Sequence, residues 1–371
     1  MSQTTLAIVS TDIRRDLIAP MRSFTRLRLT HFYRQAGYND LTPADLDDSL
    51  VPYDSPAALH HLLAETRPDL LQNVEIFSLR QFPYVRVITG HASRYAIPLY
   101  AGVHISLPLR YKYGLPIALA LKLILQPTLR ATRLFFYLNE GGRRNLRWLG
   151  VPEAKMKRLM YATWGVDPDE FTPIRDGREP AWDAPTVLFI GRIDAEKGVF
   201  DLLEAWQQVQ TTVPGTQLKL VGSGPQQADA QAWVQQHGLA DSIQFLGTIK
   251  NRDLPPLLRA AAVFTCPSQS NRKWEEYVGM TNIQAMACCV PVVTTRSGAI
   301  PEYVPEAAGI LAPERDPAAL AEGLIRLLKN PALRRQMGQA GRAHAVTYGN
   351  AFENVRRAEE ILLQTLHENR P

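Results

Sequence analysis

The chain has 371 residues, of which 46% are hydrophobic and 21% charged, and its formal net charge is +5. This composition is typical of a folded globular protein, and the length fits two α/β domains better than one. We expect no membrane-spanning helix, because no run of about 18 apolar residues without a charge occurs.

The first half of the chain predicts strands that alternate with helices. The first buried strand is expected at Leu6–Ser10. A helix rich in Arg and aromatic residues is expected near 23–36. Three more buried strands are expected at Leu70–Gln72, Pro98–Val103 and Leu134–Leu138.

An apolar segment, PIALALKLILQ at residues 116–126, lies between the last two of these strands. Arg110 and Lys112 precede it, and Arg130 and Arg133 follow it. We interpret it as a helix of the core. The alternative is a peripheral membrane contact, with the apolar side chains inserted and the cations on anionic lipid.

The second half shows the alternation more clearly. Helices are expected near 199–210, 226–237, 253–260, 330–345 and 350–367. Strands are expected at Thr186–Ile190, Leu218–Val221, Ile243–Phe245, Ala262–Thr265, 291–294 and Ala308–Leu311. This order predicts a parallel, doubly wound sheet that binds ligands at the carboxyl ends of its strands. The polar stretch 173–185 is expected to link the two domains.

The cellular location is expected to be cytoplasmic. The N-terminus, MSQTTLAIVSTDIRRD, lacks the basic start and apolar core of a signal peptide. Cys266, Cys288 and Cys289 lie in apolar surroundings, which indicates reduced thiols.

Positive charge is concentrated in the first half of the chain. Residues 1–180 contain 23 Lys and Arg against 17 Asp and Glu, and the remainder contains 18 against 19. The simplest interpretation is a solvated basic face. An anionic acceptor and the inner face of an anionic membrane are the alternatives. We expect no nucleic-acid partner, because no binding motif accompanies the charge.

Two segments of the second half contain residues that suit a ligand-binding or catalytic site. In the first, Gly191 ends a strand, and Arg192 and Lys197 follow it; two fixed cations there suit a diphosphate leaving group. In the second, Glu276 is followed by Gly279 and an apolar helix. A glycine there lets backbone N–H groups approach a ligand at the positive end of the helix.

These segments resemble the retaining GT-B glycosyltransferases of family 4, the glycosyl transferases group 1. The pattern G-R-x-x-x-E-K-G begins at Gly191 and precedes the acidic motif at Glu276. Three other matches are a G-V-D-x-x-x-F-x-P segment, a G-x-G-P turn at Gly222 and a Pro-Ser pair before Glu276. His104 ends a strand where the family often has a histidine.

The resemblance implies an α/β fold of the GT-B class, with two Rossmann-like doubly wound domains facing a cleft. The N-terminal acceptor-side domain would span 1–178 and the nucleotide-sugar domain 179–348. A last helix at 349–371 would pack back on the first domain. The implied activity is retaining transfer of a sugar, a hexose by expectation, from a nucleotide-diphosphate sugar to a hydroxyl of a glycolipid, polysaccharide or small molecule.

The resemblance also implies roles for individual residues. Arg192 and Lys197 would hold the diphosphate, Glu276 would bind hydroxyls of the donor sugar, and His104 would line the reaction centre. The donor site would be completed by Gly191, Gly222, Gly279, Met280, Thr281 and Gln284. We expect a UDP-sugar ahead of a GDP-sugar as donor. No cofactor and no metal are expected, because neither D-x-D sequence, at 45–47 and 167–169, follows a strand.

Three departures from the family pattern stand out. Gln284 replaces the second glutamate of the motif, Cys289 replaces a common glycine, and residues 10–16 replace a glycine-rich loop. They keep one alternative open, a GT-B protein that binds a sugar nucleotide with weak or no transfer. The basic first half of the chain keeps a second alternative open, a basic adaptor for membranes or nucleic acid.

Overall fold

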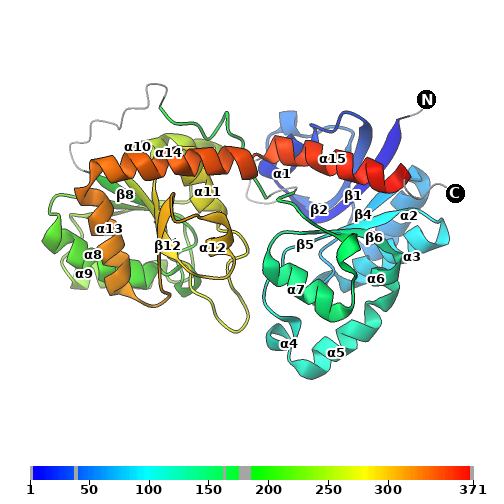
Figure 1. The fold of residues 1–371 in the computed structure, drawn as a ribbon, viewed down its shortest axis with the longest axis horizontal. Helices are drawn as coiled ribbons and strands as arrows, with labels where there is room; N and C mark the ends of the chain where they lie inside the picture. The colour runs from blue at the N-terminus through cyan, green and yellow to red at the C-terminus, as the bar shows by residue number, and fades with distance from the viewer. Residues whose placement is uncertain (1–2, 37–40, 162–163, 175–184, 368–371) are drawn as a thin grey trace. The chain divides into compact units, whose positions relative to one another are not determined.

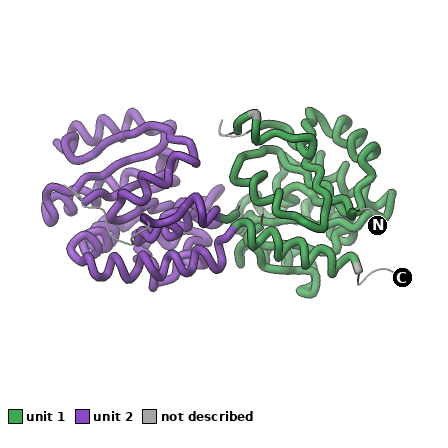
Figure 2. The backbone as a smooth tube through the Cα atoms, turned by 90° about the horizontal axis from the view of Figure 1, so that it is seen from above, with its two compact units in different colours: residues 1–165, 351–371 green, residues 166–350 purple. Residues whose placement is uncertain are grey.

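The computed structural model of the chain describes residues 3–36, 41–161, 164–174 and 185–367. Its contacts divide it into two compact units, residues 1–165 with 351–371 (unit 1) and residues 166–350 (unit 2) (Figure 2). Each unit contains one parallel sheet covered by helices (Figure 1).

The boundary between the units differs from the predicted one at residue 178. Val166 forms a parallel bridge with Asn350, and its N–H donates to the carbonyl of Gly349 at 2.7 Å. The boundary therefore lies within the G-V-D segment, between Gly165 and Val166. Most of the predicted linker, residues 175–184, lies outside the described residues.

Unit 1 has a seven-stranded parallel sheet with the order β3-β2-β1-β4-β5-β6-β7. Its strands are β1 (Thr4–Ile13), β2 (Leu27–Ala36), β3 (Leu50–Pro52), β4 (Leu70–Asn73), β5 (Leu99–Val103), β6 (Thr132–Tyr137) and β7 (Met156–Arg158). Its helices are α1 (Arg15–Met21), α2 (Pro56–Thr66), α3 (Phe82–Arg94), α4 (Leu109–Lys112), α5 (Leu115–Ile124), α6 (Gln126–Ala131), α7 (Glu140–Leu149) and α15 (Ala351–His367). The strands expected at 6–10, 70–72, 98–103 and 134–138 are all present.

The helix expected near 23–36 is wrong, because this segment is mostly strand β2. It pairs with β1 in parallel register from Thr4 opposite Leu27 to Ile13 opposite Ala36. Leu27, Leu29 and Tyr33 all belong to the hydrophobic core of unit 1 or pack against it. Their spacing of two or four residues places them on one face of a strand. The Arg-rich composition obscured this period.

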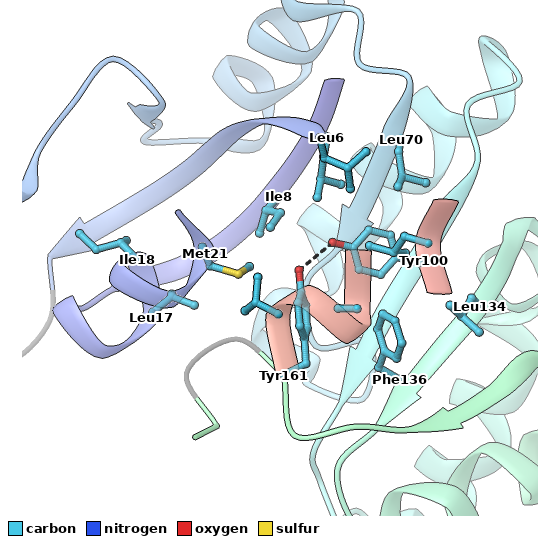
Figure 3. Close-up of a cluster of buried hydrophobic side chains, with 14 of the residues drawn as sticks. Leu6, Ile8, Leu17, Ile18, Met21, Leu70, Tyr100, Leu134, Phe136 and Tyr161 are labelled. Atoms are coloured by element: carbon cyan, nitrogen blue, oxygen red, sulfur yellow. Dashed lines mark hydrogen bonds between the residues drawn. The ribbon is translucent and has the colours of Figure 1, made fainter. Parts of the chain in front are cut away.

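One hydrophobic cluster of unit 1 lies between the sheet, α1 and α15 (Figure 3). Leu6 and Ile8 of β1 project into it, and Val355 and Leu362 of α15 face them. A buried carboxylate also fastens α15 to the unit. Glu359 accepts hydrogen bonds from the N–H groups of three consecutive residues, 25–27, at 2.7–2.9 Å.

The apolar segment 116–126 is not a core helix, so that interpretation is wrong. In α5 only Ala118 and Leu121 are buried. Leu115, Ile117, Leu119, Leu123 and Ile124 are between 47% and 74% exposed. Within the described ranges, no helix is long and apolar enough to cross a bilayer.

Unit 2 has a six-stranded parallel sheet with the order β10-β9-β8-β11-β12-β13. Its strands are β8 (Thr186–Ile190), β9 (Gln217–Val221), β10 (Ile243–Gly247), β11 (Val263–Cys266), β12 (Val292–Thr295) and β13 (Gly309–Ala312). Its helices are α8 (Val199–Thr212), α9 (Gln227–Gln236), α10 (Leu254–Ala260), α11 (Met280–Ala287), α12 (Ile300–Tyr303), α13 (Pro317–Lys329) and α14 (Pro331–Tyr348). Every strand and helix predicted in this half is present, within two or three residues at each end.

Close backbone approaches fix the loops at the carboxyl ends of β8 and β9. Gly222 has a φ of +131°, and a Cβ atom there would lie 1.9 Å from the carbonyl oxygen of Gly191. Only glycine fits such a position. The two strand ends, which the sequence marks with Gly191 and Gly222, therefore touch through their backbones.

Candidate functional site

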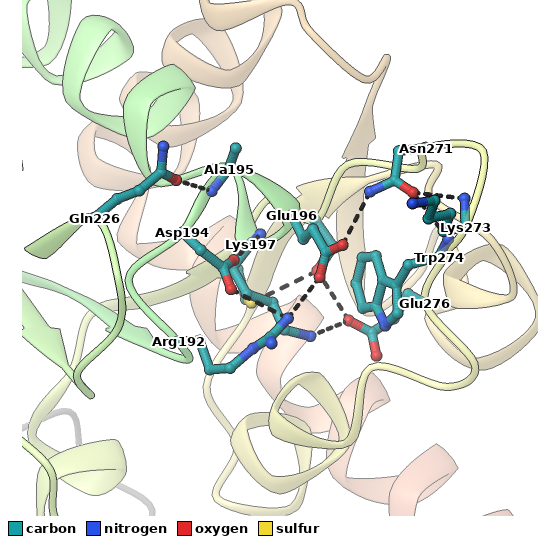
Figure 4. Close-up of polar contacts among 12 residues, drawn as sticks. Arg192, Asp194, Ala195, Glu196, Lys197, Gln226, Asn271, Lys273, Trp274 and Glu276 are labelled. Carbon is teal, nitrogen blue, oxygen red and sulfur yellow. Dashed lines mark hydrogen bonds and ion pairs between the residues drawn. The ribbon is translucent and has the colours of Figure 1, made fainter. Parts of the chain in front are cut away.

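Lys197 and Glu276, from two separate motifs, meet at the carboxyl edge of the unit 2 sheet (Figure 4). A short turn, η4 (Ala195–Lys197), begins at Asp194, whose Oδ1 accepts the N–H of Lys197 at 3.0 Å. At Gly198, where φ is +68°, a Cβ atom would lie 1.9 Å from the carbonyl oxygen of Pro267. This contact holds the turn against the loop after β11. Lys197 Nζ lies 2.5 Å from Glu276 Oε2.

The pair is shielded from solvent. The side chains of Lys197 and Glu276 are 18% and 13% exposed. Ser268 Oγ donates to the same Oε2 atom at 2.9 Å, and the ring centroid of Trp274 lies 4.7 Å from Nζ. Burial opposes the ammonium charge, but the Glu276 carboxylate outweighs it, so the pKa of Lys197 is raised. Lys197 is therefore a cation at neutral pH.

Arg192 lies at the exposed end of the same network. One of its terminal nitrogens lies 2.6 Å from Glu196 Oε2 and 3.1 Å from Asp194 Oδ2. The other oxygen of Glu196 accepts from Asn271 Nδ2 at 2.9 Å. Two carboxylates thus hold a guanidinium that is 56% exposed. A phosphate that binds Arg192 would compete with both of them.

The backbone of Glu276 is fixed beside the start of α11. A Cβ atom at Gly298, where φ is +51°, would lie 2.2 Å from the carbonyl oxygen of Glu276, and the N–H of Ala299 donates to that oxygen at 2.8 Å. Gly279, with a φ of +78°, precedes α11. The first N–H groups of a helix, here those of Met280 and Thr281, have no partner within the helix and form its positive end. The structure thus groups Arg192, Lys197, Glu276 and the start of α11 at one edge of the sheet.

Gln284 lies in α11 and is 7% exposed. Its Nε2 donates to Asn251 Oδ1 at 2.9 Å. Asn251 begins the short turn η5 (Asn251–Asp253) before α10. The amide is therefore engaged within the protein, and its predicted contact with a ribose stays a prediction.

His104 belongs to unit 1 and lines a cavity of 590 Å³ there. The cavity opens at the carboxyl ends of β1, β4 and β5. Its polar lining includes Asp12, Arg14, Gln35, Gln72, Asn73, Glu75 and Gln81. Arg14 also pairs with Asp16 at 3.1 Å. In place of a glycine-rich loop, β1 runs almost directly into α1 here.

Glu75, which was not predicted from the sequence, holds His104. Its Oε2 lies 2.9 Å from His104 Nδ1 and accepts the backbone N–H of His104 at 2.8 Å. Its Oε1 accepts the N–H of Phe77 at 3.0 Å. Burial raises the pKa of Glu75, but His104 and these hydrogen bonds outweigh it, so the pKa is lowered. Its position just after β4 was the signal, since His104 follows β5 in the same way.

The aspartates of the first D-x-D sequence have structural partners. Asp45 accepts hydrogen bonds from Thr42, and Asp47 accepts from Ser49 and pairs with Arg22 at 2.8 Å. Among the described residues, no three His, Cys, Asp or Glu side chains are grouped so that they could hold a metal ion.

Comparison with known proteins relates the sequence of unit 2 to a family of glycosyltransferases. The sequence model of the glycosyl transferases group 1 matches residues 171–344, which lie within unit 2. A GDP-mannose-dependent monoacylated alpha-(1-6)-phosphatidylinositol monomannoside mannosyltransferase of Corynebacterium glutamicum is 33% identical over 48% of this chain and 49% of its own length. A glycogen synthase of Mycobacterium tuberculosis is 30% identical over 51% of this chain and 47% of its own. The chain thus spans about half the length of the curated relatives it matches.

Solved structures extend the likeness in fold to both units. The sucrose-phosphate synthase of Thermosynechococcus elongatus has a TM-score of 0.75 at 21% identity and covers 99% of this chain and 100% of its own. Anabaena HepE in complex with UDP has a TM-score of 0.78 at 16% identity and covers 97% of this chain and 100% of its own. The fold is therefore that of the GT-B glycosyltransferases, and residues 171–344 match the sequence model of the glycosyl transferases group 1.

Proposed function

We propose that this protein is a retaining glycosyltransferase that moves a hexosyl group from a nucleotide-diphosphate sugar to a hydroxyl acceptor. The observation that carries the proposal is the buried Lys197–Glu276 pair, which lies at the carboxyl edge of the sheet in a group 1 glycosyltransferase unit. A cation and a carboxylate held together there suit a substrate with a diphosphate at one end and sugar hydroxyls at the other.

In this proposal the bond between the sugar's anomeric carbon and the diphosphate oxygen breaks. A bond to the acceptor oxygen forms on the same face of the sugar. The acceptor's proton passes to the leaving diphosphate. Lys197 and Arg192 stabilise the negative charge that grows on the diphosphate. Glu276 accepts a hydrogen bond from a hydroxyl of the sugar, and N–H groups at the start of α11 bind anionic or hydroxyl oxygens.

The donor that we propose first is a UDP-sugar, with a GDP-sugar as the alternative. The HepE structure contains UDP, whereas the names of three relatives specify GDP-mannose. We propose that no metal takes part. Rates that are unchanged by EDTA would support this, and a rate that recovers only with Mg²⁺ or Mn²⁺ would contradict it.

The acceptor that we propose is lipid-linked or anionic and is reached from the cytoplasmic face of a membrane. The names of several relatives include a phosphatidylinositol mannoside, which supports a lipid-linked hydroxyl. The polar cavity of unit 1, lined by Arg14 and His104 among others, offers hydrogen-bonding groups to an acceptor.

The first experiment is a screen of UDP-, GDP- and ADP-sugars by thermal unfolding, followed by detection of the released nucleotide diphosphate. A donor at about 100 times its Kd should stabilise the protein by about 2.7 kcal/mol. Arg192→Ala and Lys197→Ala should each lower turnover by about 10²-fold. Arg335→Ala, on the exposed side of α14, is the matched control. If both site variants turn over at the wild-type rate, the proposed diphosphate site is wrong.

A second candidate is a protein that binds a sugar nucleotide without transferring the sugar. The bond from Gln284 to Asn251 favours it, since this amide is engaged where the family pattern has a glutamate. This candidate would be supported over the transferase by two results together: a donor stabilises the protein, and no nucleotide diphosphate is released when extracts that contain acceptors are added.

A further inference from the structure

Helix α5 of unit 1 is apolar on the side that faces solvent. Its exposed residues are Leu115, Pro116, Ile117, Leu119, Ala120, Leu123 and Ile124. At about 100° per residue they cover about 200° of the helix circumference without one polar side chain. Ala118 and Leu121, on the opposite side, are buried. Apart from Lys122, the helix is thus apolar on every side, which is typical of helices that other apolar material covers.

More than half of the large hydrophobic side chains that are exposed among the described residues lie at this place. Of the eleven large hydrophobic side chains that are exposed, five belong to α5, and Tyr111 of the adjacent α4 is a sixth. Figure 1 shows α4 and α5 together at one end of unit 1. A contiguous apolar patch of this kind marks a binding surface, whereas scattered apolar side chains do not.

Positive charge is concentrated in the segment of the chain that contains α5. Residues 101–150 contain eight Lys and Arg and only one acidic residue, Glu140, whereas residues 1–100 contain ten of each sign. The basic excess of the first half therefore arises around α4–α7. Arg110 precedes α5 and Arg130 follows it; both are exposed, and neither has an ion pair with a described residue.

Lys122, the one charged residue of α5, leaves the apolar face clear. Its Nζ donates to the carbonyl of Trp148 at 2.7 Å and lies 5.0 Å from the centroid of that indole ring. Its ammonium is thereby held at the edge of the helix, beside an amphipathic ring of the kind that is enriched at membrane interfaces.

We propose that the outer face of α5 is a docking surface for an anionic lipid bilayer. The helix would lie in the plane of the interface, with its apolar side chains among the acyl chains and with Arg110 and Arg130 on anionic headgroups. Its ten residues, about 15 Å long, are too few to span a bilayer.

The charge distribution favours a bilayer over a second copy of the chain. A symmetric dimer through α5 would place the same cation-rich segment of each copy against the other, and like charges at an interface oppose association. An anionic bilayer complements both the apolar face and the cations, because it has an apolar interior and negatively charged headgroups.

Vesicle sedimentation of the full chain without donor tests the proposal. We expect binding to phosphatidylcholine vesicles that contain phosphatidylglycerol, weaker binding to phosphatidylcholine alone, and a loss of affinity as salt rises. The double variant Leu119→Asp/Leu123→Asp should lower the partition coefficient about tenfold or more. Leu46→Asp is the matched control, because Leu46 is 48% exposed in unit 1 outside the patch.

Charge is tested separately from apolar contact. Arg110→Gln and Arg130→Gln should each weaken binding to anionic vesicles about fivefold at low salt. Arg326→Gln and Arg335→Gln, on exposed sites of α13 and α14, should not. Thermal unfolding checks that every variant is folded.

Two results would overturn the proposal. One is vesicle binding that is absent, or that is unchanged by the α5 variants. The other is self-association that the double Leu variant abolishes while vesicles bind nothing, which would assign the face to a second copy. Because no donor is present, either result leaves the proposed transfer activity untouched.

Discussion

Lys197 Nζ and Glu276 Oε2 lie 2.5 Å apart, although 79 residues separate them in the chain. Their contact joins the turn after β8 to the loop before α11. The charge of Lys197 is therefore already compensated when a diphosphate arrives, and the pair is organised before the donor binds.

Removing one partner of this pair should destabilise the protein more than removing both. Lys197→Met leaves a shielded carboxylate without its cation, and Glu276→Gln leaves the cation without its carboxylate. Each should lower the free energy of unfolding by about 3 kcal/mol, and the double variant should recover much of that loss. Urea unfolding measures this. Activity should be lost in all three variants. A double variant as unstable as the sum of the singles would contradict the prediction.

Glu75 should affect catalysis through His104. Its carboxylate accepts the Nδ1 proton and so fixes the tautomer in which Nε2 carries the lone pair. Glu75→Gln should lower turnover about tenfold or more, with His104 still present. In ¹⁵N NMR spectra, the His104 resonances should change from one tautomer to a mixture.

The matched control for Glu75 is Glu65→Gln. Glu65 pairs with His61 at 3.2 Å on the exposed surface of α2. This substitution removes the same kind of contact from an unrelated place and should leave turnover unchanged. If Glu75→Gln keeps both the wild-type rate and a single His104 tautomer, Glu75 has no positioning role.

How far the sequence predicted the structure depends on how distinctly each element is encoded. The strands of unit 2 are runs of branched apolar residues, several of them closed by glycine, and all six were predicted. β2 was missed, because its Arg and aromatic residues obscure the alternation of apolar side chains. Residues 116–126 were assigned to the core, because an apolar helix has the same composition whether protein or another apolar medium covers it.

The site was predicted in part for a similar reason. Motif order placed Lys197 and Glu276 in one site, but no sequence pattern indicates that they bond to each other or that Ser268 joins them. Glu75 and His104 follow different strands, 29 residues apart. Only the pairing of β4 with β5 brings them together.

His31 should make the stability of unit 1 depend on pH in a mildly acidic range. It is fully buried, with Nε2 2.7 Å from Ser10 Oγ, and burial lowers its pKa from 6.5 to about 4. The unfolded chain therefore binds a proton between pH 6.5 and 4 that the folded chain does not. The contribution of His31 to the free energy of unfolding is therefore fully present above pH 6.5. The free energy of unfolding should fall by about 3 kcal/mol as the pH is lowered to 4.

Replacing His31 tests this pH dependence. His31→Gln keeps a donor for Ser10 but does not titrate. Its free energy of unfolding should therefore fall less than that of the wild type between pH 6.5 and 4. Parallel curves for the two proteins would show that His31 is not the source of the slope.

Cys289 occupies a backbone conformation that favours glycine. Its φ is +61°, and the family pattern has glycine at this place. A left-handed residue with a side chain costs about 1–2 kcal/mol. Cys289→Gly should therefore be more stable than Cys289→Ala by about 1 kcal/mol in urea unfolding, since both lose the thiol and only the second keeps a Cβ atom. Equal stability would mean that the strain is relieved elsewhere.

Gln284 and Asn251 should behave as a coupled pair. Asn251→Asp keeps an acceptor for Gln284 Nε2, and Gln284→Glu keeps a bond if the Asn251 amide turns to donate. Each single variant should lose less than about 1 kcal/mol of stability. The double variant places two carboxylates about 2.9 Å apart at a site that is 7% exposed, and it should lose about 2 kcal/mol more than the sum. Repulsion raises the pKa of one carboxyl, so acidification should restore stability.

Variants of Gln284 and Asn251 also distinguish a structural role of Gln284 from a role in donor binding. Gln284→Glu should keep donor affinity, because a carboxylate accepts from ribose hydroxyls at least as well as an amide does. Gln284→Leu should weaken donor binding by about 1–3 kcal/mol. Asn251→Ala breaks the same internal bond but keeps the Gln284 side chain, so calorimetry should show nearly wild-type affinity. If Gln284→Leu also binds the donor as the wild type does, Gln284 only packs α11 against η5, and donor recognition rests on Arg192, Lys197 and Glu276.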